Sequence, residues 1–206
     1  MNLKWNLSKV LSFLESSTST SETSSLRKTT FLLLATGWRI SEVHARVREE
    51  DFCRFTERNS LLLKPHSSFL AKNGLRRRLE PKEIKALKLQ DGQTSNICPV
   101  EALKEYLSFT SKKKEGPLFI NPKDSNILSI FQLRYQICSL ITEADPNTKA
   151  KVHDIRKYAA SCSFQQDMLV GDLTEDFNWS TSAIFYKFYF LQTDILDMPV
   201  SLPVRS

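Results

Sequence analysis

The chain has 206 residues, of which 41% are hydrophobic and 25% charged, values typical of one globular domain with a core rather than of a disordered protein. Only 5 Gly and 8 Pro are present, which excludes fibrous and low-complexity architectures. No apolar run approaches the length of a membrane span, and the N-terminus lacks a signal-peptide pattern. The 4 Cys are widely spaced without a CxxC pair, which favours reduced thiols and predicts no metal site.

The net charge of +6 is concentrated in one part of the chain. Between Lys64 and Lys88, eight Lys or Arg residues stand against two Glu, which equals the whole net charge. A concentrated basic segment on a balanced body fits contact with a phosphate backbone. Charge alone would favour a solvated surface, so this segment indicates nucleic-acid binding only together with other motifs.

The N-terminal residues form a segment of their own in this interpretation. Helical spacing of apolar residues predicts a short amphipathic helix over residues 3–14. The Ser/Thr-rich stretch 16–25 follows and is interpreted as a flexible linker. The expected divisions are an N-terminal segment with its linker at 1–25, a globular domain at 26–192 and a tail at 193–206.

The globular domain is predicted to be mainly helical with a small antiparallel sheet, an α+β fold. Gly37 ends its first helix, and Pro99 begins the best-defined one, because proline is favoured in a first turn. Asn73-Gly74 predicts a tight hairpin turn. In chain order, the helices are expected at 26–36, 39–47, 99–110, 129–143, 152–169 and 180–192. The strands are expected at 52–55, 60–64 and 76–80.

Two short motifs carry side chains that suit a phosphodiester under attack. Gly37-Trp38-Arg39-Ile40-Ser41-Glu42 contains one arginine, and His153-Asp154-Ile155-Arg156 contains a histidine and a second arginine. A guanidinium donates two parallel hydrogen bonds to two oxygens, which matches the charge that develops on the phosphate. His153 and Arg156 are three residues apart, so a helix would present them on one face. Taken singly, each motif is common by chance.

In combination these motifs resemble the tyrosine recombinases of the phage-integrase family. GWRISE resembles their GxRxxE box and HDIR their HxxR box, Trp179 falls at their His/Trp position and Tyr189 at their nucleophile. Further phrases resemble the recombinases of DIRS-type retrotransposons and Cryptons, namely Trp5-Asn6-Leu7, Phe69-Leu70-Ala71-Lys72 and Cys98-Pro99-Val100. The resemblance covers roughly residues 3–192 and implies the catalytic domain of that family.

The resemblance implies an enzyme that cleaves and rejoins DNA without metal or other cofactor. Tyr189 would attack the scissile phosphate, giving a 3′-phosphotyrosine and a free 5′-hydroxyl. A phenol has a pKa of about 10, so Tyr189 needs a proton acceptor, and His153 is a candidate. Lys72 would protonate the leaving 5′-oxygen from the tip of the expected hairpin.

The remaining roles concern phosphate binding and support. Arg39, Arg156 and Trp179 would donate hydrogen bonds to the non-bridging oxygens. Glu42, three residues beyond Arg39, would hold the arginine or histidine in place. The basic runs would contact the DNA backbone or be solvated: Arg76, Arg77, Arg78, Lys112, Lys113 and Lys114.

Alternatives exist for two of these roles. Tyr186 competes with Tyr189, since they lie seven and ten residues after Trp179 and neither matches the spacing that many family members show. We choose Tyr189 on the retroelement wording and interpret Tyr186 as a packing residue. Lys64 is an alternative to Lys72 but precedes a proline. His44 and His66 are interpreted as structural or surface residues.

The resemblance also implies partners: double-stranded DNA, a homo-oligomer formed on it, and the nucleus as location, with no membrane. Family members carry a separate N-terminal clamp domain of about 100 residues, an ordinary domain size. Here the clamp is expected on another chain, unless the sequence is a truncated copy or a fragment. The tail would dock on a neighbouring protomer or fray. The alternative functions are a catalytically silent DNA-binding module and a protein-interaction domain.

Overall fold

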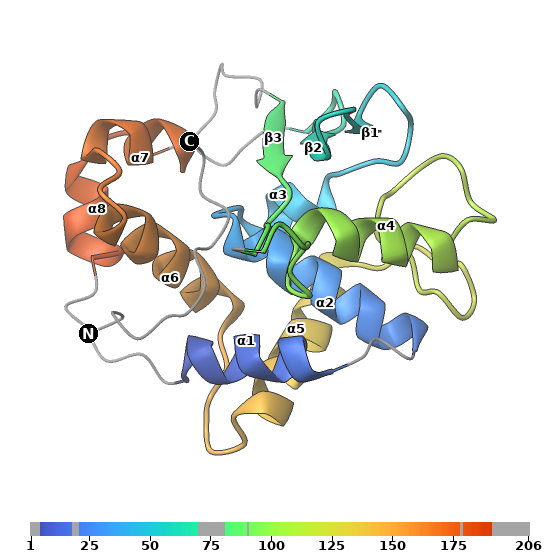
Figure 1. The fold of residues 1–206 in the computed structure, drawn as a ribbon, viewed down its shortest axis with the longest axis horizontal. Helices are drawn as coiled ribbons and strands as arrows, with labels where there is room; N and C mark the ends of the chain where they lie inside the picture. The colour runs from blue at the N-terminus through green and yellow to red at the C-terminus, as the bar shows by residue number, and fades with distance from the viewer. Residues whose placement is uncertain (1–4, 18–20, 70–80, 90, 178, 191–206) are drawn as a thin grey trace.

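The computed structural model describes residues 5–17, 21–69, 81–89, 91–177 and 179–190 (Figure 1). A bundle of helices surrounds one buried helix, and a small sheet lies at its edge (Figure 1). Among the described residues the elements are α1 Leu7–Ser16, α2 Glu22–Ala35, α3 Ile40–His44, β1 Cys53–Phe55, β2 Ser60–Leu63, β3 Lys82–Lys85, α4 Pro99–Phe109, α5 Ile130–Ala144, α6 Val152–Gln165, α7 Val170–Asp176 and α8 Ala183–Phe188. No described helix is long and apolar enough to cross a membrane.

Helix α2 is the centre of the fold. It contacts α3, α4, α5 and α6, and almost every residue from Ser25 to Ala35 is buried. Burial on all sides follows from the apolar run Phe31-Leu32-Leu33-Leu34, which leaves no polar face for solvent. Two buried hydroxyls of the helix have backbone acceptors, since Thr29 donates to Ala102 O on α4 at 2.7 Å and Thr30 to Leu26 O at 2.8 Å.

Helix α1 belongs to the same core as the rest of the domain. Asn6 caps it by accepting from the amide of Ser8 at 2.8 Å, and its apolar side chains pack into the main hydrophobic cluster. Helix α2 begins at Glu22, so the boundary expected at residue 25 falls inside a helix. The reason is that Ser21 acts as an N-cap, accepting from the amide of Ser24, rather than as part of a linker.

The three strands form an antiparallel sheet in the order β1-β2-β3. Arg54 pairs with Leu62, and Leu61 pairs with Ile84, which places the last two side chains in the core. The strand expected at 76–80 and the hairpin turn at Asn73-Gly74 lie outside the described residues. The described third strand is instead Lys82–Lys85.

Helices α4 and α5 follow the sequence prediction closely, whereas three others are shorter than predicted. Helix α3 ends at His44 because Arg46 and Val47 form β-bridges with Pro65 and Pro117. Helix α6 ends at Gln165, where Asp167 adopts a φ of 63° that a helix cannot contain. The separate helix α7 then lies between the two helices predicted at 152–169 and 180–192, and α8 covers only the middle of 180–192.

Arg48 fastens the loop that follows α4 to the body of the domain. Its buried guanidinium donates to four carbonyl oxygens, those of Thr110, Lys113, Pro117 and Leu118, at 2.7–3.2 Å. Burial lowers the pKa of Arg48 from its usual value. The arginine therefore satisfies backbone acceptors that would otherwise be buried without donors.

Replacing Arg48 with Met should lower the free energy of unfolding by about 3 kcal/mol, because several buried carbonyls lose their donor. Urea denaturation measures the change. Arg54→Met removes a guanidinium from an exposed strand position and serves as the control, with an expected change of about 0.5 kcal/mol or less. Equal effects of the two substitutions would contradict this role of Arg48.

Candidate active site

A cavity of about 760 Å³ opens where α3, α5, α6 and α8 meet. Its described lining includes five Lys or Arg residues and no Asp or Glu: Arg39, Arg134, Lys151, Arg156 and Lys157. Aromatic and apolar side chains from Trp38, Ile184 and Phe188 form much of the remaining wall. Positive groups in an otherwise apolar recess favour the binding of an anion.

Two arginines of the cavity are held by one buried carboxylate. Glu42, which is 2% exposed, accepts from Arg39 Nη1 at 3.0 Å and lies 3.5 Å from Arg156 Nη1. The same carboxylate accepts from the backbone amide of Arg39 at 2.8 Å, so it also closes the first turn of α3. The first turn of α3 thereby fixes Arg39, and the contact between Glu42 and Arg156 links α3 to α6.

Arg156 is more deeply buried than Arg39, and its guanidinium donates hydrogen bonds to two backbone carbonyls. It donates to Gly37 O at 2.6 Å and to Phe177 O. Burial lowers its pKa to about 10, against the opposing effect of Glu42, so the guanidinium stays charged at neutral pH. Gly37 is required here, because its φ is 91° and a Cβ would lie 2.7 Å from the Phe177 ring.

Tyr189 follows the last residue of α8 and lines the cavity. Its ring lies 4.6 Å from that of Trp179 and 5.7 Å from that of His153, centroid to centroid. Its phenol is close enough to Arg156 to oppose the lowering of that residue's pKa through charge and a hydrogen bond. The backbone is fixed as well, since Tyr189 O accepts from Ser161 Oγ at 2.7 Å.

Tyr186, the alternative nucleophile, faces elsewhere. Its side chain is 55% exposed and is not part of the cavity lining, whereas Tyr189 is 7% exposed. It packs instead against the rings of Phe164, Phe185 and Phe190. Tyr186 lies within α8, whereas Tyr189 is the C-cap residue with a non-helical φ of −122°, and the two phenols have different surroundings.

His153 stands in the first turn of α6 at the mouth of the cavity. Its pKa is lowered, first by partial burial and then by the positive charges of Lys157, Arg156 and Arg39, against the opposing effect of Asp154. A lowered pKa keeps the imidazole neutral at pH 7, and a neutral ring has a nitrogen that accepts a proton.

Trp179 packs its indole against Phe177 and Tyr189, with the Arg156 guanidinium 5.9 Å from the ring centroid. Its Nε1 is buried and has no hydrogen-bond partner within the described part of the chain. Buried donors without partners are rare in folded proteins. This N–H is therefore a donor whose hydrogen-bonding capacity is unused.

The structure thus brings together Arg39, Glu42, His153, Arg156, Trp179 and Tyr189. Lys72 and the run Arg76 to Arg78 lie outside the described residues. Lys64 does not line the cavity. The run Lys112 to Lys114 lies in the loop beyond α4, on the side of the molecule away from α8 (Figure 1).

Sequence reasoning missed several residues at the site. Trp38 was quoted in a motif without a role, and Arg134, Lys151 and Lys157 were not singled out, yet all four line the cavity. Lys82 Nζ lies 5.9 Å from the ring centroids of both Trp38 and Phe177. Arg134 and Cys138 are four residues apart on α5, so helical spacing predicts that they share one face of that helix. The spacing does not predict that this face lines the cavity.

The remaining histidines and the cysteines have other surroundings. His44 Nε2 lies 2.9 Å from Leu128 O, and His66 pairs with Ser68 on the surface. Within the described ranges no group of three His, Cys, Asp or Glu side chains is arranged to hold a metal ion.

Replacing Glu42 with Gln should lower the free energy of unfolding by about 3 kcal/mol, because the buried guanidinium of Arg156 and the partly buried one of Arg39 lose their shared counter-charge. The matched control is Glu101→Gln, which breaks an exposed Glu–Lys pair of 2.8 Å on α4. Exposed pairs contribute about 0–1 kcal/mol, so the control should be nearly neutral. Urea unfolding of both variants checks the difference, and a neutral Glu42→Gln would refute the bridging role.

Stability should fall as the pH drops through about 6.5, the ordinary pKa of histidine, toward the lower pKa of folded His153. In that window the unfolded chain binds a proton that the folded chain resists, so protonation favours unfolding. Urea titrations between pH 5 and 8 measure this. His153→Gln should remove that part of the pH dependence, while the surface variant His66→Gln should retain it.

No protein-family model and no curated protein matches this chain. Among solved structures it is similar to the crystal structure of XerA recombinase, with a TM-score of 0.65 and 14% sequence identity over 95% of this chain and 61% of that one. The chain thus spans less than two thirds of the length of XerA. The predicted mainly helical domain with a small antiparallel sheet, a recombinase fold, is confirmed.

Proposed function

We propose that this chain is a DNA strand-transfer enzyme of the tyrosine recombinase type, with Tyr189 as nucleophile. The observation that carries the proposal is the placement of the Tyr189 ring against His153 and Trp179, in a cavity that also contains Arg39 and Arg156. A buried phenol beside two guanidiniums is suited to attack on a phosphodiester, whose charge the arginines neutralise.

In the proposed reaction the Tyr189 oxygen forms a bond to phosphorus and the bond to the 5′-oxygen breaks. The phenolic proton passes to the neutral His153, whose lowered pKa leaves it unprotonated at pH 7. The leaving 5′-oxygen takes a proton from a cation, for which Lys72 is the proposed donor. Because a phosphotyrosine ester replaces the phosphodiester, a 5′-hydroxyl can reverse the step and rejoin the strand.

Binding of the phosphate falls to the fixed donors. Arg39 and Arg156 are oriented before substrate arrives, because Glu42 and two backbone carbonyls hold them. The buried Nε1 of Trp179 would add a single donor. Preorganised donors of this kind lose little free energy on reorganisation, and one of them is typically worth about 10²–10³ in rate.

The wider setting follows from the sequence resemblance and stays a proposal. The substrate would be double-stranded DNA, engaged by a homo-oligomer, with a clamp domain provided by another chain. The DIRS-type or Crypton-type branch of mobile-element recombinases and a nuclear location belong to the same proposal. Lys112, Lys113 and Lys114 would contact the DNA backbone away from the reacting phosphate, which predicts salt-sensitive binding.

A covalent-adduct assay tests the proposal. With a nicked suicide DNA duplex and EDTA, the wild-type chain should become covalently attached through a phosphotyrosine. Tyr189→Phe should abolish attachment, because the reacting oxygen is gone, while DNA binding should be kept. Denaturing gels with labelled DNA give the readout.

Tyr186→Phe is the matched control, since it removes a phenol three residues away in the chain that lies outside the cavity. It should retain attachment within a few-fold of wild type. Loss of the adduct in Tyr186→Phe instead would move the nucleophile and leave the reaction class intact. Salt-sensitive DNA binding without an adduct under any condition would identify a silent DNA-binding module.

A further inference from the structure

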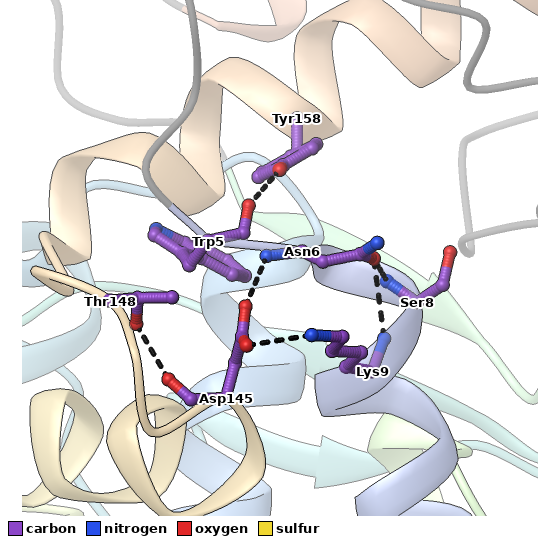
Figure 2. A network of polar contacts seen from close by, with 7 residues as sticks. All are labelled: Trp5, Asn6, Ser8, Lys9, Asp145, Thr148 and Tyr158. Carbon is purple, nitrogen blue, oxygen red and sulfur yellow. Dashed lines mark hydrogen bonds and ion pairs between the residues drawn. The ribbon is translucent and has the colours of Figure 1, made fainter.

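The residues Trp5 to Lys9, here called the N-terminal strap, connect the start of the described chain to helix α6 (Figure 2). The Tyr158 hydroxyl donates to Trp5 O, and the two rings lie 4.9 Å apart, centroid to centroid. Trp5 and Tyr158 are both buried. Burial raises the pKa of Tyr158 to about 12, so its hydroxyl keeps its proton and donates this hydrogen bond.

The strap is also anchored to the end of α5. Asp145 directly follows α5, and its carboxylate accepts from the Asn6 amide at 3.1 Å and from Lys9 Nζ at 2.9 Å (Figure 2). The backbone carbonyl of Asp145 accepts from Thr148 Oγ1 at 2.8 Å, which shapes the connection from α5 to α6. One short segment thus contacts both helices that flank the cavity on this side.

Tyr158 and Arg156 belong to opposite faces of α6. With about 100° per residue, two positions along a helix are about 200° apart. Arg156 is bonded to Gly37 and Phe177 on the cavity side, and Tyr158 to Trp5 on the other. Two contacts on opposite faces prevent the helix from rolling about its axis.

A small roll would matter for the site. At about 5–6 Å from the helix axis, a 20° rotation moves a side-chain tip by about 2 Å. Hydrogen bonds tolerate only a few tenths of an ångström, and misplacement by about 1 Å can cost about 10² in rate. His153 and Arg156 both depend on the rotational setting of α6.

We infer that the N-terminal strap is a positioning element for the candidate active site, with Tyr158 and Trp5 as its positioning residues. The expected effect on the rate of covalent attachment rests on the proposed function. The expected effect on the orientation of α6 does not. The strap sets the orientation of α6, so that the His153 imidazole and the Arg156 guanidinium face the cavity together.

The test compares Tyr158→Phe with Tyr106→Phe. Both remove a buried tyrosine hydroxyl that donates to a backbone carbonyl, Trp5 O in one case and Ile120 O in the other. Tyr106 lies on α4 and does not line the cavity, so its variant controls for loss of stability alone. Urea unfolding establishes how far each variant is destabilised.

Two readouts are taken on each variant under folded conditions. An NMR titration of the His153 side chain, assigned with His153→Gln, should show a pKa closer to 6.5 in Tyr158→Phe, because a rotation of α6 would change the partial burial of the ring and its distance from Arg39. The rate of covalent attachment should fall about 10-fold with DNA affinity changed by about twofold at most. Tyr106→Phe should alter neither.

The outcomes separate this inference from the proposed function. If Tyr158→Phe and Tyr106→Phe give the same His153 titration and the same rate, the strap is merely structural and the inference is overturned. If the wild-type chain forms no adduct, the proposed function fails. The His153 titration alone then tests the inference about the strap. A shift seen only in Tyr158→Phe then still supports the strap.

Discussion

The Glu42 carboxylate is the interaction on which the arrangement of the cavity depends. It is almost fully buried and contacts guanidiniums from two segments that are more than a hundred residues apart, Arg39 and Arg156. A buried carboxylate between two arginines offsets charge that neither could carry alone in an apolar surrounding. Without it, α3 and α6 would bring two positive charges together without a counter-charge, which would destabilise the folded state.

The remaining geometry follows from this convergence. Gly37 allows its carbonyl to reach Arg156 only because its φ is positive and no Cβ meets the Phe177 ring. Phe177 and Trp179 then pack over the guanidinium, and Tyr189 packs against Trp179. The aromatic surroundings lower the local polarity, which strengthens electrostatic interactions within the cavity.

Several elements were predictable because their signals are local. Pro99 and the spacing of Val100, Leu103 and Tyr106 mark α4, and the apolar run before Gly37 marks α2. The linker assigned to residues 16–25 overlooked the capping role of Ser21, since a run of Ser and Thr has the same composition in either case. The end of α6 at Gln165 depends on a left-handed Asp167, a conformation that its sequence permits but does not require.

The sequence by itself determined which chemical groups are available and in what order, because motif residues such as Arg39, His153 and Arg156 carry their chemistry wherever the chain places them. Only the tertiary structure decided that they share a cavity with Tyr189 rather than Tyr186, since two phenols three residues apart are distinguished by what packs around each. It also decided that Trp5 bonds to Tyr158, and that Arg134, Lys151 and Lys157 join the cavity. Contacts between distant segments depend on the packing of whole helices, and no local pattern encodes that packing.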